Sequence, residues 1–191
     1  FPVADVMEEV VAARQLAACM LLCLAAAAAP AQTPDLVVNG SFEANGTAVK
    51  GVGYVRQGNP VAAWRSDGSG STGRNTARMP FHDNGRIPDG NVVCVLQNQA
   101  VLAQTIEGLE PERLYRLRLQ VNGRASDGLT AGGHGILSVV LNGTPLLGPA
   151  EIVPVDPRNT YDTPFSTLEA LFRTGGAPLD LEIRQISDRP G

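Results

Sequence analysis

The sequence predicts an all-β protein, an antiparallel β-sandwich or jelly roll. Beyond residues 1–31, the apolar runs are short, rich in Val, Leu and Ile, and separated by Gly, Pro, Asn and Asp, which is the pattern of strands joined by turns. Several runs alternate apolar and polar residues, as a strand with one face on a core does. No convincing helical period occurs in this part of the chain. Many short strands at close spacing favour two packed antiparallel sheets.

Residues 1–31 have the layout of a secretory signal peptide with extra residues upstream of it. Residues 16–29 are almost wholly apolar, follow Arg14 and lead into small residues; a positive residue, an apolar stretch and a small-residue exit are the parts of such a signal. The run is shorter than the about 20 residues that a membrane-spanning helix needs. A buried alanine-rich helix and a lipoprotein box ending at Cys19 are the alternatives, but the apolar stretch follows this cysteine instead of preceding it. We expect cleavage before Gln32 and bacterial-type export to the cell envelope or the exterior.

Residues 32–191 have the length of a single domain. The leader carries three of the 19 acidic residues and one of the 15 basic residues, so the mature domain is slightly acidic. Nucleic acid and anionic membranes attract proteins with a strong basic excess, so neither is expected as a partner. Cys94 is the only cysteine of the mature domain, which excludes an intrachain disulfide, and its apolar neighbours indicate a small buried side chain.

The first expected strands are three short apolar runs. Residues 36–38 give the first strand, which ends at an Asn-Gly turn. Residues 91–96 and 100–106 give two more, joined by the polar turn 97–99. An antiparallel hairpin is therefore expected in the middle of the chain.

The later strands show clearer alternation. Residues 113–121 place apolar side chains on one face and polar side chains on the other, which indicates a half-buried strand. Residues 136–141 alternate as well and end at an Asn-Gly hairpin signal. Residues 163–173 fit a strand better than a short helix, and residues 179–184 again alternate apolar with charged side chains.

One long segment lacks these signals. Residues 67–89 are dense in Gly, Ser, Asn, Arg and Asp and hold few apolar residues. We expect a long loop there, and a loop of this length in a compact domain is usually functional or disordered.

Catalytic patterns are weak throughout the chain. The two histidines, His82 and His134, lie about fifty positions apart in the sequence. Residues 68–73 are rich in Gly and Ser but lack the Gly-x-Ser-x-Gly spacing of a nucleophile elbow. Asp180 and Glu182 share a strand face, yet neighbouring acids on an exposed face are more often a solvated surface than an acid and base pair. We therefore expect a protein that is not an enzyme.

Binding residues are better represented. A sugar site needs an aromatic face against C–H groups, together with planar amide, carboxylate or guanidinium groups that meet pairs of hydroxyls. The alternative role of the single tryptophan is core packing at a sheet corner. The alternative for the polar face of strand 113–121 is a solvated surface that binds no ligand. The expected ligand-binding residues are Trp64, Asn84 and Arg86 from the loop side, and Arg118, Gln120 and Asn122 from the sheet side.

Several short motifs succeed one another in a characteristic order. A first strand runs into Asn-Gly-Ser-Phe-Glu, a glycine precedes a Val-rich strand, a Gln-Thr-Ile strand comes next, and Gly-Leu-Glu-Pro leads into Tyr-Arg-Leu; these are residues 36–43, 90–96, 104–106, 108–111 and 115–117. This order resembles the galactose-binding-domain-like jelly rolls. Within that group it is similar to exported carbohydrate-binding modules and to related cell-wall-associated domains.

The resemblance implies a structural calcium ion. In many such modules the acidic residue after the first strand binds calcium, and Glu43 occupies that position. The usual partner is an Asp on the final strand; the chain stops at Gly191 before the usual closing motif, so Asp180 and Asp188 are the remaining candidates. A domain that lacks its final strand would have an unpaired edge beside the first strand. Phe42 is expected to anchor that first strand in the core.

The resemblance also implies a function. We expect a secreted, noncatalytic carbohydrate-binding domain that recognises an extracellular or cell-wall polysaccharide. The first alternative is a structural or adhesive surface protein that binds protein partners through the same sandwich. The second is an accessory domain of a larger glycoside hydrolase.

Overall fold

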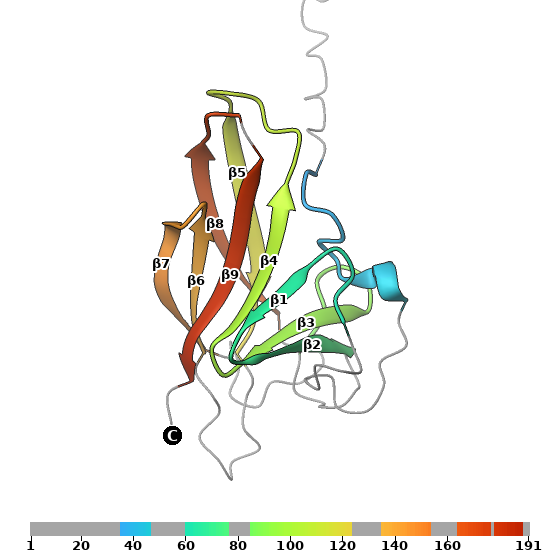
Figure 1. Cartoon of the computed structure of the whole chain (residues 1–191). Coiled ribbons are helices and arrows are strands. Elements are labelled where there is room, and N and C mark those ends of the chain that lie inside the picture. Colours follow the sequence, from blue (N-terminus) through green and yellow to red (C-terminus); the bar gives the residue numbers. More distant parts are fainter. Residues whose placement is uncertain are drawn as a thin grey trace, which may run out of the picture. The chain divides into compact units, whose positions relative to one another are not determined.

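The computed structural model describes residues 35–46, 60–76, 85–123, 135–153, 164–176 and 178–188. These residues contain nine strands and one 3-10 helix (Figure 1): η1 (Glu43–Asn45), β1 (Arg65–Gly68), β2 (Ser71–Thr76), β3 (Val92–Gln97), β4 (Ala100–Ile106), β5 (Leu114–Val121), β6 (Gly135–Leu141), β7 (Thr144–Ile152), β8 (Ser166–Arg173) and β9 (Leu179–Asp188). The all-β prediction is confirmed. In this described part of the chain, no helix is long and apolar enough to cross a membrane.

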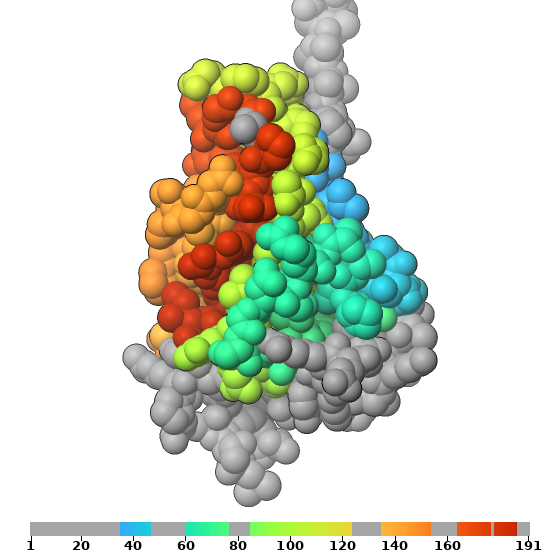
Figure 2. Space-filling view, viewed as in Figure 1, coloured from blue at the N-terminus to red at the C-terminus, as the bar shows by residue number. Residues whose placement is uncertain are grey.

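The strands form one large sheet and two small ones. The large sheet has the order β1-β4-β9-β6-β7, and the small sheets are β2-β3 and β5-β8. Every pairing is antiparallel. Figure 2 shows β4, β9, β6 and β7 on the face toward the viewer, with β1 beside β4. In Figure 1, β5 and β8 lie behind this sheet, so the predicted antiparallel sandwich is confirmed.

The core lies between the large sheet and the two small ones. One buried cluster combines Leu117 of β5 with Val139 of β6 and Leu181 of β9. A second cluster, built on Leu102 and Ile183, receives Cys94 and Leu96 of β3. These side chains come from alternate positions of their strands, so the alternation in the sequence predicts which face of each strand is buried.

The expected first strand is not formed, and this prediction is wrong. Residues 36–38 lead into a turn in which the amide of Phe42 donates to the carbonyl of Asn39 at 3.1 Å. The first strand of the described residues is β1; Asn39 and Phe42, which follow residues 36–38, have φ angles of 54° and 65°, so the backbone turns there as the Asn-Gly signal predicted. Phe42 does pack against the second buried cluster, as predicted.

The described residues do not test whether a further strand is missing, so the unpaired edge beside the first strand stays a prediction. The last described strand, β9, pairs with β4 on one side and with β6 on the other. It therefore lies inside the large sheet, while β1 and β7 form the two edges.

The long loop expected at residues 67–89 is partly β-structure, which is a second correction. It includes the end of β1 and all of β2, and β2 pairs along its whole length with β3. Gly70 allows the tight crossing between β1 and β2, because a Cβ there would collide with the carbonyl oxygens of Gln97 and Asn98. Polar residues of β2 are buried, among them Thr72 and Asn75, so no apolar run marks this strand in the sequence.

The other predicted strands are confirmed, and their ends agree with the prediction within four residues. The turn expected at 97–99 has positive φ at Asn98 and Gln99, and the predicted Asn142-Gly143 turn also has positive φ at both residues. Such angles match the primed turns of two-residue hairpins. The second hairpin leads into β7, which the sequence did not predict as a strand.

Candidate functional site

The small sheet β5-β8 presents an exposed polar face on the side away from the core. Burial alternates along both strands, with Tyr115 and Phe172 stacked on the inner side at 5.7 Å between ring centroids. The opposite side chains are all exposed. We call this surface the β5–β8 outer face; it consists of Leu114, Arg116, Arg118, Gln120, Thr167, Glu169, Leu171 and Arg173.

The strand register brings complementary polar groups together on this face. Arg118 lies opposite Glu169, and Gln120 lies opposite Thr167. The Thr167 hydroxyl donates to Oε1 of Gln120 at 3.2 Å. Directly opposed residues have Cβ atoms about 4.5–5.5 Å apart, so a guanidinium, a carboxylate, an amide and a hydroxyl lie within one patch. These are groups that can meet the paired hydroxyls of a sugar.

The other predicted sheet-side and loop-side residues are placed less favourably. Asn122 comes just after β5 but its Oδ1 atom is buried, so this oxygen does not extend the outer face. Arg86 is exposed before β3. Asn84 lies outside the described residues. The structure therefore places Arg118 and Gln120 on one exposed face, and all the ligand-binding assignments stay predictions.

Trp64 lies at a different place, directly before β1. Its amide donates to the carbonyl of Val61 at 3.1 Å, closing a turn in which Ala63 has a φ of 66°. The indole Nε1 donates to the Asn39 carbonyl at 3.2 Å, and the ring lies 6.0 Å from that of Phe42. Trp64 also packs against both buried clusters. Trp64 therefore has the structural role that was the alternative, and this packing together with the hydrogen bond to Asn39 fixes the position of the ring.

A pocket of about 300 Å³ lies beside this tryptophan. Its described lining is Pro60, Val61, Trp64, Ser66 and Thr72. The hydroxyls of Ser66 and Thr72 are in hydrogen-bonding contact. The sequence had no signal for this pocket beyond Trp64 itself, because the other residues come from separate strands and turns.

Gln104 holds this region together, and sequence reasoning missed its role. Its side chain is buried, at 5% exposure. Oε1 accepts from the Val38 amide and Nε2 donates to the Val38 carbonyl, both at 2.8 Å, while Nε2 also donates to the Ala63 carbonyl at 2.9 Å. The side-chain amide thus pairs with Val38 as a neighbouring strand would, which explains how residues 36–38 are held without strand pairing.

Glu43 binds backbone amides. Its Oε1 accepts from the amides of Asn91 at 2.5 Å and Val92 at 2.8 Å, where β3 begins. Gly90 makes this contact possible, because a Cβ at this residue would collide with the carboxylate. Within the described residues, no group of three or more His, Cys, Asp or Glu could hold a metal ion. These residues do not complete a calcium site around Glu43, and calcium stays a prediction.

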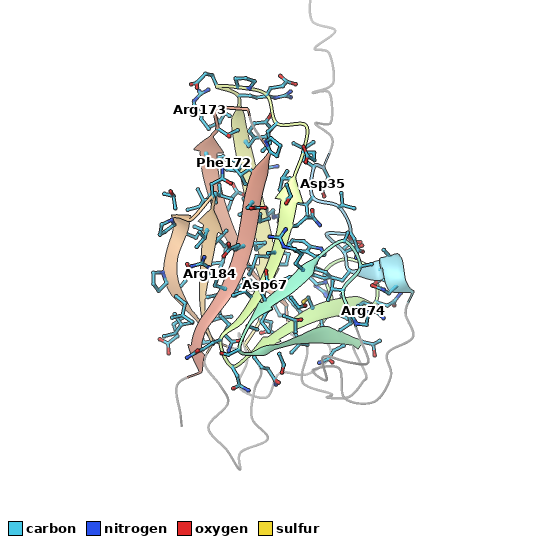
Figure 3. All side chains as sticks on the ribbon, viewed as in Figure 1. Asp35, Asp67, Arg74, Phe172, Arg173 and Arg184 are labelled. Carbon is cyan, nitrogen blue, oxygen red and sulfur yellow. The ribbon has the colours of Figure 1, made fainter. Side chains whose placement is uncertain are left out.

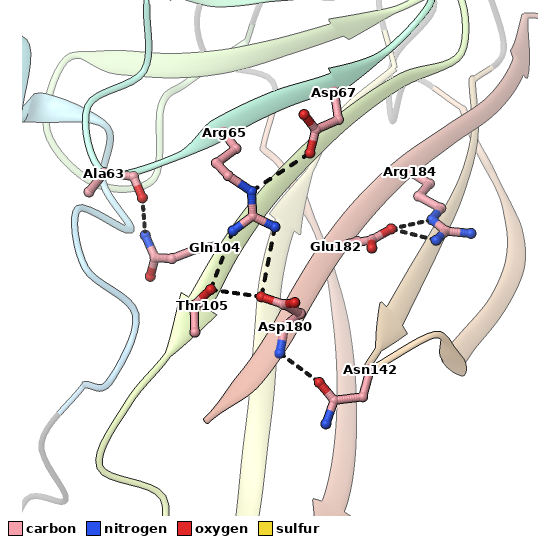
Figure 4. A network of polar contacts seen from close by, with 9 residues as sticks. All are labelled: Ala63, Arg65, Asp67, Gln104, Thr105, Asn142, Asp180, Glu182 and Arg184. Atoms are coloured by element: carbon pink, nitrogen blue, oxygen red, sulfur yellow. Dashed lines mark hydrogen bonds and ion pairs between the residues drawn. The ribbon is translucent and has the colours of Figure 1, made fainter. Parts of the chain in front are cut away.

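The outer face of the large sheet carries a network of charges (Figure 4). Arg65 lies 3.8 Å from Asp67 and 3.7 Å from Asp180, and Thr105 donates to Asp180 at 2.7 Å. Further along β9, Glu182 and Arg184 form an ion pair at 2.5 Å. Asp180 and Glu182 therefore each face a guanidinium group, which fits the predicted solvated surface. Exposed pairs of this kind contribute about 0–1 kcal/mol each.

Two further ionisable side chains have structural roles. Burial raises the pKa of the Cys94 thiol to about 12, although a hydrogen bond from the Gly73 backbone acts in the opposite direction. Such a thiol is a poor nucleophile at neutral pH, and Cys94 packs against the second buried cluster, as the sequence indicates. Arg74 lies beside η1 in Figure 3, and its Nη1 donates to the Gly46 carbonyl at 2.6 Å.

Comparison with known proteins identifies similar solved structures only. No family model and no curated protein matches the sequence. A family 35 carbohydrate binding module from Clostridium thermocellum is 9% identical and has a TM-score of 0.45, with 67% of this chain and 84% of that chain covered. The CBM22-1 xylan-binding domain of Xyn10C from Paenibacillus barcinonensis is 8% identical and has a TM-score of 0.46, with 73% and 89% covered.

A third similar structure is of another kind. The enzymatically active domain of tailspike protein 4 from bacteriophage CBA120 is 15% identical, with a TM-score of 0.40, and the match covers 76% of this chain but only 20% of that chain. Two of the three are carbohydrate-binding modules, the class that the order of sequence motifs resembles. Because identities and TM-scores are low, the fold class rests on the strand pairing of this chain, and its function has to be argued from the site.

Proposed function

We propose that this chain is a noncatalytic carbohydrate-binding domain that holds an extracellular or cell-wall polysaccharide on the β5–β8 outer face. The observation that carries the proposal is the register of this sheet, which sets Arg118 opposite Glu169 and Gln120 opposite Thr167 on one exposed surface. A polysaccharide presents rows of hydroxyls, and each of these side chains can accept from or donate to them. Exposed polar contacts contribute little individually, so modest affinity is expected.

A binding assay with insoluble polysaccharides tests this proposal. The full chain is mixed with cellulose, xylan or chitin, with and without calcium, and the protein retained after washing is measured. Replacing Arg118 and Gln120 together with Ala should weaken binding to the polymer by roughly five- to 150-fold, because two hydrogen-bonding groups at about 0.5–1.5 kcal/mol each are lost. Arg184→Ala is the matched control, since it removes a partly exposed arginine from the other sheet.

The outcomes separate clearly. Selective loss in the double variant, with Arg184→Ala behaving as wild type, supports the β5–β8 outer face. Equal retention of the double variant and the wild type would contradict it. If the insoluble polymers do not retain the protein and no glycan of a soluble panel binds it, with or without calcium, the carbohydrate proposal itself fails.

A protein partner is the second candidate, because two large apolar side chains lie on the same face. Leu114 is 52% exposed and Leu171 is 60% exposed, and the register places them diagonally to each other. An adhesive role predicts concentration-dependent self-association in light scattering. Leu171→Gln should abolish that association while leaving polysaccharide retention unchanged.

A further inference from the structure

We infer that the pocket beside Trp64 is a second binding site, separate from the β5–β8 outer face, that takes one neutral pyranose ring. The inference does not depend on the proposed function, because the described lining of the pocket contains no residue of that face.

The pocket arises where the chain passes from one sheet to another. β1 pairs with β4 in the large sheet, whereas β2 pairs with β3 in a small sheet. The two strands therefore diverge from their shared turn (Figure 1). Ser66 of β1 and Thr72 of β2 face the space between them, and the turn that ends at Trp64 supplies the remaining described lining.

The lining is fixed before any ligand arrives. The indole is held by its hydrogen bond to Asn39 and by its contact with Phe42. The turn before it is held by Gln104 through the Ala63 carbonyl. Val61 and Thr72 are 3% and 4% exposed, so the inner part of the pocket belongs to the packed core. A preformed site avoids the cost of ordering side chains on binding.

The chemistry of the lining selects the ligand. The indole of Trp64, the ring of Pro60 and the side chain of Val61 offer apolar surfaces suited to C–H groups. Ser66 and Thr72 offer hydroxyls, and each hydroxyl has one donor and two acceptor positions, so their mutual contact leaves capacity for a ligand. None of the described lining residues is charged, so an ionised ligand would lose its hydration without gaining a counter-charge from them.

The size of the pocket points to a single ring. Its volume of about 300 Å³ is at the lower end of ligand pockets, which span about 300–1,000 Å³. A pyranose combines an apolar ring face with several hydroxyls in a compact shape, and this matches the mixed lining. A polymer in extended form would have to lie on an open surface such as the β5–β8 outer face.

The chain contains one tryptophan, so any change of the indole signals can be assigned to Trp64, and the variants below assign it to the pocket. The full chain is titrated with glucose, galactose, mannose and xylose, and with glucuronate as the charged counterpart. Trp64 emission and the single indole Nε1–H signal in a proton–nitrogen NMR spectrum are followed. At least one neutral sugar should give a saturable change, and glucuronate should bind at least tenfold more weakly than that sugar.

Two variants and two controls complete the test. Ser66→Ala and Thr72→Val should each raise the Kd for the neutral sugar about three- to tenfold, as expected for the loss of one hydrogen-bonding group. Thr105→Val removes a hydroxyl from the outer face of the large sheet and should leave the Kd unchanged, as should replacement of Arg118 and Gln120 with Ala. Because Ser66 is exposed, its variant gives a result even if Thr72→Val lowers stability.

The inference is overturned if no neutral sugar changes either signal in a saturable manner. It is also overturned if the Ser66 and Thr72 variants bind as the wild type does. Failure of the polysaccharide assay with a saturable sugar titration would remove the proposed function and leave the pocket in place. The reverse result would remove the pocket and leave the β5–β8 outer face.

Discussion

The most informative stability prediction concerns Gln104→Leu. The buried side-chain amide makes three hydrogen bonds to backbone atoms of Val38 and Ala63, at 2.8, 2.8 and 2.9 Å. Leucine has a similar size but can make none of them. Two segments that precede β1, 66 and 41 residues away from Gln104 in the sequence, would lose their tie to β4.

The magnitude comes from the number of bonds. A hydrogen bond within a protein contributes about 1 kcal/mol net, so the loss of three should lower the free energy of unfolding by about 3 kcal/mol. The Val38 side chain is exposed at 61%, so we expect water to reach its backbone groups in the variant and the larger penalties of fully buried groups not to apply. Gln120→Leu is the matched control, because it removes an exposed glutamine that makes one hydrogen bond at 3.2 Å. It should change stability by about 0.5 kcal/mol or less.

Urea unfolding of the full chain, followed by Trp64 emission, measures both variants. Hydrogen exchange of the Val38 amide gives an independent local measurement, and it should become faster in Gln104→Leu only. The role assigned to Gln104 is wrong if Gln104→Leu destabilises no more than Gln120→Leu. It is also wrong if Val38 exchange stays at the wild-type rate, since the amide would then be protected by some other group.

The remaining predictions concern Gly90 and Cys94. Gly90→Ala should lower the free energy of unfolding by about 2–3 kcal/mol, because its φ of 70° is unfavourable for alanine and the new Cβ displaces the Glu43 carboxylate. Gly143→Ala is the control: this residue has a φ of 79° and open space around it, so its variant should lose only about 1 kcal/mol. Equal losses of the two variants in urea unfolding would argue against the role of Glu43. Since burial raises the pKa of Cys94 to about 12, the folded chain should keep this thiol protonated as pH rises past 9, while the unfolded chain releases its proton. Peptide-mapped iodoacetamide labelling should therefore be slow in the native chain at pH 8–9 and fast in urea, and comparable native and unfolded rates would show that the thiol is accessible and ionised.

Much of the fold could be predicted because burial in strands is a local pattern. Residues 113–121 and 179–184 alternate, and the structure buries Leu117, Leu181 and Ile183 as that alternation requires. Hairpin turns such as Asn142-Gly143 were predictable for a related reason, since their φ angles depend on the residues of the turn itself.

The missed elements depend on residues far away in the sequence. β2 carries the sequence Ser-Thr-Gly-Arg-Asn-Thr, and it is a strand because β3 pairs with it along its whole length. Residues 36–38 are apolar like a strand, but a glutamine side chain from β4 takes the place of the neighbouring strand. Neither relation leaves a local signal. Arg118 and Gln120 alternate within one strand, so their shared exposed face was predictable from the local sequence. Ser66, Thr72 and Trp64 come from different elements, so their grouping was not.

The two proposed sites place different demands on the fold. The β5–β8 outer face needs only a stable two-stranded sheet, so variation of its exposed residues should cost little stability. The pocket beside Trp64 is made from residues that also close the core, such as Val61 at 3% exposure, so most substitutions there change packing as well as binding. Because the two sites share no described lining residue, the free energies of unfolding lost in a variant of each should add when the variants are combined, and each variant should leave the Kd of the other site unchanged. A variant of the pocket that alters polysaccharide retention on the β5–β8 outer face would show that the two sites are coupled.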